Sequence, residues 1–183
     1  MNTITKYDDT VDEIEAEYEK QYNLYHGMRS KKSAEQIKRE GFCAYNTNID
    51  IKRNVINSLK FFGKEQVLSS SGRTGQLVRF HLHKDSPLNR RNIWATTRKD
   101  IATDYALTSP EHVSMILQNV GIPKENIVRY LREKQGSNCH VIKLKLTSLG
   151  PNINFNTGLN CVSPHFIDSI ETFTCAHKKR NKR

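Results

Sequence analysis

The chain has 183 residues, 36% of them hydrophobic, with a formal net charge of +10 at pH 7 and a mean hydropathy of −0.68. This length predicts one domain with a sizeable core, and no apolar run approaches the roughly 20 residues that a membrane helix needs. The first residues lack the basic and then apolar pattern of a signal peptide. We therefore expect an intracellular, cytoplasmic protein without a membrane partner, or an effector that is delivered into another cell.

The charge is distributed unevenly along the chain. Residues 1–20 contain seven acidic and two basic residues, a net charge of −5, so residues 21–183 carry +15. Such a field attracts nucleic acid, the pyrophosphate of a nucleotide or an acidic protein, although it also serves solubility alone.

The four cysteines, Cys43, Cys139, Cys161 and Cys175, show no Cys-x-x-Cys spacing. This pattern argues against a zinc knuckle and against a disulfide framework. We expect free and mostly buried thiols.

The first predicted elements lead up to a histidine. Residues 10–22 predict a helix with one acidic face, because Thr10 and Glu13 fit a capping box and apolar residues recur at helical spacing. Residues 22–27, with the sequence Tyr-Asn-Leu-Tyr-His-Gly, predict a strand that stops at Gly27.

The next segment is predicted to be helical. Residues 33–41 fit a short helix with Ser33 as the N-cap and Gly41 at the C-terminal end. Residues 49–68 predict more helix, with a stripe of apolar side chains on one face, and residues 69–75 predict a flexible loop.

The remaining chain mixes strands and helices. The predicted elements are strands over 76–83 and 92–97, helices over 98–109, 110–121 and 124–136, a strand over 139–150, a last strand or short helix over 165–174, and a basic tail over 177–183. This order predicts an α+β fold whose strands need not be parallel.

Two segments share residues suited to a flat ligand. His26 and Gly27 end one predicted strand, whereas Trp94 lies on another strand and Tyr105 lies eleven residues later on the following helix. Facing aromatic rings stack on a flat ring, and more strongly on a cationic one. A histidine can hydrogen-bond a ribose hydroxyl, and a glycine lets a ligand approach the backbone.

These motifs resemble the ADP-ribosyltransferase superfamily. The sequence Tyr25-His26-Gly27, the segment Trp-Ala-Thr from Trp94, and Ala-x-x-Tyr ending at Tyr105 are similar to the diphtheria-toxin and poly(ADP-ribose)-polymerase branch. The helix of residues 33–41 also fits that pattern. The resemblance covers about half of the chain.

The resemblance implies a fold and a cofactor. The fold is a single ADP-ribosyltransferase-like domain over 1–176, with a split β-sheet core, flanking helices, and the acidic helix of 1–20. The cofactor is NAD, used as a substrate and without a metal. His26 would hold a ribose hydroxyl, Gly27 would pair with the nicotinamide carboxamide, Tyr105 would stack on the nicotinamide, and Trp94 occupies the position of the family's first tyrosine.

The sequence departs from the family at three places. Met28 replaces a serine or threonine. The separation of 68 residues from His26 to Trp94 is longer than the branch usually has, which predicts a helical insertion at about 48–75. Residues 135–167 contain no acidic residue, although a carboxylate should stabilise the oxocarbenium character of the reaction. Glu171 is the candidate for that catalytic role.

Three functions fit these features. The first is a mono-ADP-ribosyltransferase that releases nicotinamide and modifies a protein or nucleic acid. The second is a catalytically impaired relative that binds NAD, ADP-ribose or RNA. The third is an RNA 2′-phosphotransferase-like enzyme, which needs several arginines around the histidine, where the sequence offers only Arg29.

Other polar residues are weaker candidates. Arg29, Lys31 and Lys32, as well as the Asn-Arg-Arg-Asn segment 89–92, either contact a pyrophosphate or form solvated basic loops. His81 and His83 would share one face of a strand, but the sequence places no third or fourth ligand, so we predict no metal site.

Overall fold

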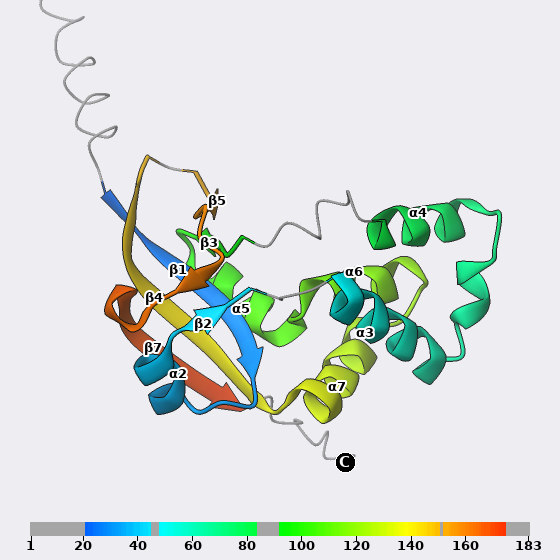
Figure 1. Ribbon diagram of the computed structural model, residues 1–183, viewed down its shortest axis with the longest axis horizontal. Coiled ribbons are helices and arrows are strands. Elements are labelled where there is room, and N and C mark those ends of the chain that lie inside the picture. The colour runs from blue at the N-terminus through cyan, green and yellow to red at the C-terminus, as the bar shows by residue number, and fades with distance from the viewer. Residues whose placement is uncertain (1–20, 45–47, 84–91, 151, 175–183) are drawn as a thin grey trace, which may run out of the picture.

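The structure is a computed structural model that describes residues 21–44, 48–83, 92–150 and 152–174. The predicted acidic helix within 1–20 and the basic tail over 177–183 lie outside these residues. The described part contains six α-helices and a five-stranded antiparallel sheet, which confirms the predicted α+β class (Figure 1). No helix in this part combines the length and the apolar character needed to cross a bilayer.

The sheet has the strand order β5-β3-β1-β4-β7, with every neighbouring pair antiparallel. Its strands are β1 (Gln21–Ser30), β3 (Trp94–Thr96), β4 (Asn138–Leu149), β5 (Asn154–Asn156) and β7 (Ile167–Thr174). A separate two-stranded ribbon pairs β2 (Phe42–Cys43) with β6 (Cys161–Val162). The strand that carries His26 is therefore the central strand of the sheet.

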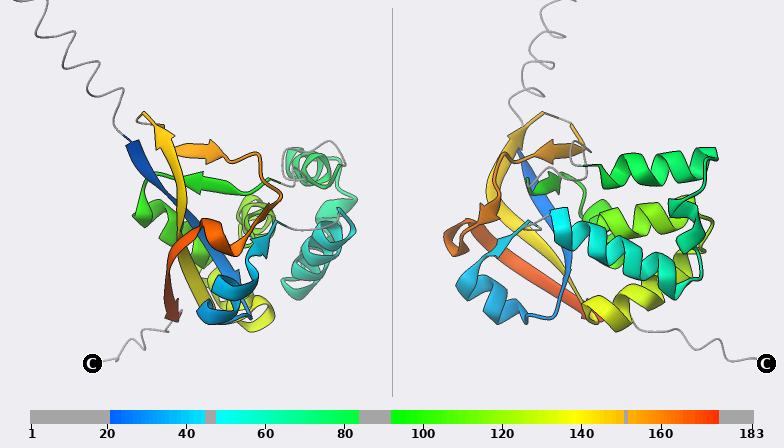
Figure 2. Two further views of the ribbon diagram at one scale, coloured as in Figure 1. Left: turned by 60° about the vertical axis from the view of Figure 1, so that its left-hand side comes forward. Right: turned by 45° about the vertical axis from the view of Figure 1, so that its right-hand side comes forward.

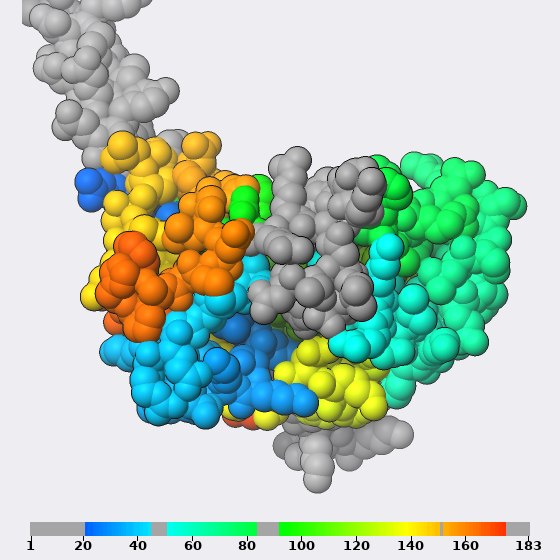
Figure 3. All heavy atoms as spheres, in the orientation of Figure 1, coloured from blue at the N-terminus to red at the C-terminus, as the bar shows by residue number. Residues whose placement is uncertain are grey.

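The helices divide between the two sides of the molecule. They are α2 (Ala34–Glu40), α3 (Asn48–Phe61), α4 (Arg73–Leu82), α5 (Lys99–Thr108), α6 (Glu111–Asn119) and α7 (Lys124–Gln135). Helices α3, α4, α6 and α7 gather beside the sheet in both views of Figure 2, whereas α2 stays with the ribbon. In Figure 3, α3 and α4 form the side of the molecule away from the sheet.

Each side has its own hydrophobic core. One core joins the sheet to α2 and the ribbon, and includes Leu24, Ile37, Phe42, Ile142 and Leu144. The other joins the helices α3, α4, α6 and α7, and includes Val55, Leu59, Val78, Ile116 and Leu131. Each fully buried aliphatic side chain contributes about 1.5–3 kcal/mol. The predicted helical segment at about 48–75 is thus an integral part of a second core.

The helix after the first strand begins and ends as predicted. The Ser33 side chain accepts a hydrogen bond from the Gln36 backbone N–H, and the Gln36 side chain accepts one from the Ser33 N–H, which forms a capping box. Gly41 follows with φ 72°, a conformation that favours glycine. Local capping residues alone therefore predict α2.

The predicted type of one element and the predicted end of another are wrong. Residues 76–83 do not form a strand but belong mostly to α4, because helical spacing lets Gly75 and Val78 be buried together. The strand β1 does not stop at Gly27 but continues to Ser30, since its pairing with β4 extends to Asn138. Apolar residues in 76–83 fit either period, and only the adjoining helices select the helical one.

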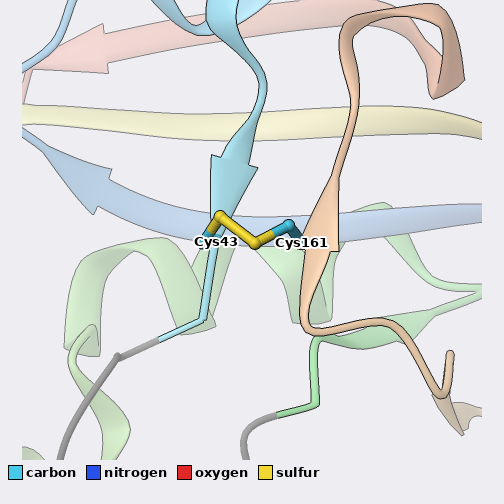
Figure 4. The surroundings of a disulfide bond; sticks show 2 residues. All are labelled: Cys43 and Cys161. Atoms are coloured by element: carbon cyan, nitrogen blue, oxygen red, sulfur yellow. A yellow bond between two sulfur atoms is a disulfide. The ribbon is translucent and has the colours of Figure 1, made fainter.

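The prediction of free cysteines is also wrong for two of the four. Cys43 and Cys161 form a disulfide that joins β2 to β6 across 118 residues of sequence (Figure 4). The two cysteines are opposite each other in the ribbon. Cys139 is a free and buried thiol, as expected, and Cys175 lies outside the described residues. Sequence spacing is silent here because the ribbon is formed by distant segments.

The buried His112 of α6 predicts a loss of stability in acid. Burial lowers its pKa from 6.5 to about 4, so the unfolded chain binds a proton at a higher pH than the folded one. Above pH 6.5 His112 is neutral in both the folded and the unfolded chain and does not change the stability. As the pH falls from 6.5 to 4, protonation of the unfolded chain lowers the free energy of unfolding by about 3 kcal/mol. Urea denaturation of the parent and of H112Q at both pH values measures this difference. An unchanged pH dependence in H112Q would contradict the assignment.

Candidate functional site

The two faces of β1 carry different chemistry. Side chains alternate along a strand, so Leu24, His26 and Met28 share one face while Tyr25, Gly27 and Arg29 share the other. Leu24 and Met28 pack in the core beneath α2 and the ribbon. On the opposite face, Gly27 lies against Ala102 of α5. We call these the ribbon face and the α5 face.

His26 is held from two directions on the ribbon face. Its Nδ1 lies 2.7 Å from the Trp94 carbonyl oxygen, and its ring stacks on Phe42 with centroids 5.0 Å apart and planes 13° apart. Because a carbonyl oxygen only accepts, Nδ1 carries the hydrogen. Burial lowers the pKa of His26 below 6.5, which keeps the imidazole neutral at pH 7. Nε2 is then a hydrogen-bond acceptor.

The pairing of β1 with β3 ends at Tyr25, directly before His26. Tyr25 pairs with Thr96, and the same register would next bring Gly27 opposite Trp94. Instead, the Trp94 carbonyl receives its hydrogen bond from the His26 ring. Within the described residues, no strand pairs with the β3 side of β1 beyond Tyr25, whereas its pairing with β4 runs on to Ser30. Among the described strands, β1 therefore has a partner from His26 to Ser30 on its β4 side alone.

Gly27 has a structural role besides its predicted role in binding. A Cβ built on it would lie 1.8 Å from the Ala102 carbonyl oxygen and 2.8 Å from the Ala106 nitrogen. Any side chain at this position would therefore push α5 away from the sheet. The glycine is needed for this close packing, and α5 is the helix that carries Tyr105.

Trp94 and Tyr105 present large aromatic side chains near this opening. Thr96 lies opposite Tyr25, so Trp94, two residues earlier, is also on the α5 face. Trp94 and Tyr105 are 46% and 37% exposed. A hydrogen bond with the Asn154 side chain holds Tyr105 to β5. Both rings are thus available to a ligand.

Two candidate residues are not brought to His26. The guanidinium of Arg29 is buried and donates to the carbonyl oxygens of Leu107 at 2.7 Å and Gly136 at 2.9 Å. It connects the ends of α5 and α7, so its predicted contact with a pyrophosphate is replaced by a structural role. Glu171 lies on β7 in an ion pair with Lys99.

The place of Glu171 in the sheet separates it from His26. It lies opposite Val141, which lies opposite Gly27, so its side chain is on the α5 face rather than on that of His26. β7 and β5 are the two edges of the sheet, about 19 Å apart if neighbouring strands are about 4.8 Å apart. The Tyr105 side chain forms a hydrogen bond with Asn154 of β5. The side chain of Glu171 therefore lies on the opposite face of the sheet from His26, and its catalytic role stays a prediction.

One acidic residue near Tyr105 was missed by sequence reasoning. Glu111 begins α6. Burial raises the pKa of Tyr105, and the nearby negative charge of Glu111 raises it further. Desolvation raises the pKa of Glu111 itself. Its position only six residues after Tyr105 in the sequence indicates that the two side chains can be close, whereas the resemblance predicts the carboxylate on a C-terminal strand.

The weaker candidates do not form a second site. His81 lies in the last turn of α4 and His83 is its C-cap, so they do not share a strand face. Lys32 forms an ion pair with Glu40, and residues 89–91 lie outside the described part. Among the described residues, no group of three or more His, Cys, Asp or Glu side chains is arranged to hold a metal ion.

Comparison with known proteins gave no further assignment: no family model, curated protein or solved structure matches the chain.

The close packing at Gly27 predicts a strong effect of one added methyl group. Gly27→Ala should lower the free energy of unfolding by about 1–3 kcal/mol, as overpacked core substitutions do. Gly72→Ser is the matched control, because a Cβ there meets only the Ser70 Oγ at 3.4 Å and serine is a favoured N-cap. Urea denaturation measures both. Equal stability of G27A and the parent would show that α5 does not rest on Gly27.

Proposed function

We propose that the chain binds NAD at the opening between β1 and β3 and transfers ADP-ribose to a macromolecular acceptor. The observation that carries this proposal is the end of the β1–β3 pairing at Tyr25–Thr96, directly before His26 and Gly27. It supports binding because a ligand amide can pair with main-chain groups that the next strand leaves open.

In the proposed complex, each residue has a defined task. Nε2 of the neutral His26 accepts a hydrogen bond from a ribose hydroxyl, while Nδ1 stays on the Trp94 carbonyl. The main chain at Gly27 pairs with the nicotinamide carboxamide. The exposed ring of Tyr105 stacks on the cationic nicotinamide, and Trp94 borders the same opening.

The transfer breaks the bond between the ribose C1′ and the nicotinamide nitrogen. The bonding electron pair leaves with neutral nicotinamide, and the acceptor nucleophile forms the new bond to C1′ and loses its proton. Positive charge develops on the ribose in between, and a nearby carboxylate lowers the energy of that state. We propose Glu111 for this task, because its charge already acts on Tyr105. The acceptor is a protein or a nucleic acid, the latter favoured by the basic charge of the chain.

A specific observation favours a second candidate function, which is binding of NAD or ADP-ribose without transfer. Among the described residues, no carboxylate forms a hydrogen bond with His26 or Tyr105. The 2′-phosphotransferase alternative receives less support, because it needs free arginines near the histidine and Arg29 is bound to two main-chain carbonyls.

Binding of NAD tests the site directly. In isothermal titration calorimetry, H26A and Y105A should each bind NAD about tenfold more weakly than the parent, or weaker still. Each variant loses a contact worth about 1–1.5 kcal/mol. Y105F retains the ring and should bind within about threefold of the parent. The exposed His165 supplies the control H165A. Parent-like affinity in H26A would remove His26 from the site.

Turnover tests the carboxylate. Nicotinamide release from NAD, followed by chromatography, should fall by about 100-fold or more in E111Q, because removal of one charge-stabilising group commonly costs this much. E171Q should retain parental turnover, since Glu171 pairs with Lys99 at the far edge of the sheet. NAD binding without release by the parent would favour the second function, and loss of turnover in E171Q alone would restore the original candidate.

A further inference from the structure

The ribbon next to His26 is short and is closed by a disulfide. β2 and β6 pair through only two residues each, Phe42 with Val162 and Cys43 with Cys161. One further backbone hydrogen bond joins them, from the Ala44 nitrogen to the Asn160 oxygen at 2.9 Å. The Cys43–Cys161 bond therefore supplies the covalent link between two strands that otherwise share few contacts (Figure 4).

The ribbon holds the aromatic ring that holds His26. Phe42 is 8% exposed and packs in the core with Ile37 and Ile142, while its ring lies parallel to the His26 imidazole. Phe42 directly precedes Cys43, so a bond that fixes the Cys43 main chain also limits where Phe42 can move. His26 is thereby held by β3 through Trp94 and by the ribbon through Phe42.

We propose that the Cys43–Cys161 disulfide positions the His26 imidazole through Phe42, so that the redox state of this cysteine pair sets the affinity of the site for NAD. The inference rests on the proposed function for the identity of the ligand. Phe42 is a positioning residue, because it acts through His26 and has no assigned contact with NAD.

The chemistry of the switch is ordinary thiol–disulfide exchange. A thiolate of an external dithiol attacks one sulfur of Cys43–Cys161, which forms a mixed disulfide and releases the other cysteine. The second thiol of the dithiol then attacks its own bridged sulfur and displaces the first cysteine. Two electrons and two protons reach the protein, which gains two thiols, while the dithiol is oxidised to a disulfide. Cys43 and Cys161 are both exposed, so a reductant can reach them.

Reduction should change the surroundings of His26 in a defined direction. Burial lowers the pKa of His26, and the Trp94 carbonyl raises it. A ribbon freed from its disulfide would let Phe42 withdraw and admit water to the ring, which removes the lowering effect. The pKa of His26 should then rise toward 6.5.

The test follows the His26 imidazole by NMR titration of the whole chain, with and without dithiothreitol. Loss of one signal in H26Q assigns the resonance. We expect a higher pKa of His26 in the reduced protein, and the same value in C43S/C161S irrespective of reductant. An identical His26 titration in both redox states of the parent would overturn the inference, and this comparison needs no cysteine variant to fold.

Calorimetry with NAD completes the test. Loss of one aromatic contact predicts about threefold to tenfold weaker binding after reduction. F42L should bind as weakly as the reduced protein, whereas F42Y, which retains the ring, should restore parental affinity. C139S is the control for effects of reductant on the buried thiol and should keep the full redox response. A redox-dependent His26 titration without NAD binding in either state would leave the positioning role standing and refute the proposed ligand.

Discussion

The contact between α5 and Gly27 is the constraint on which the site depends. A Cβ at this position would lie 1.8 Å from the Ala102 carbonyl oxygen, so the helix rests on bare backbone. This proximity sets the distance of α5 from the sheet, and with it the place of Tyr105. The same helix end receives the guanidinium of Arg29 at Leu107. The packing of α5 and the position of Tyr105 are therefore governed by the same few residues of β1.

The opposite face of β1 solves a different physical problem, which is how to keep a histidine oriented. A neutral imidazole has one donor and one acceptor, and the Trp94 carbonyl occupies the donor. Stacking on Phe42 limits rotation of the ring and contributes to the burial that keeps the pKa low. The site thus combines an oriented acceptor from the ribbon face with aromatic rings from the α5 face, at the point where β3 leaves β1.

Sequence reasoning succeeded where the signal is local and failed where it depends on distant partners. The capping box at Ser33, the strand predicted over 139–150 and the helix after Trp94 were all predictable from neighbouring residues. Residues 76–83 were not, because their apolar positions fit both a strand and a helix until the second core selects one. Glu171 was placed correctly on a last strand, but its distance from Tyr105 depends on the order of strands in the sheet.

The sequence by itself determined the elements that flank the site and the residue types within it, since helix caps and the spacing of Trp94 and Tyr105 are properties of short segments. Only the tertiary structure decided which of these residues meet. It paired Cys43 with Cys161, put Phe42 on His26, and turned Arg29 inward to two carbonyls. The physical reason is that strand order and register fix which face each side chain takes, and no local pattern contains that information.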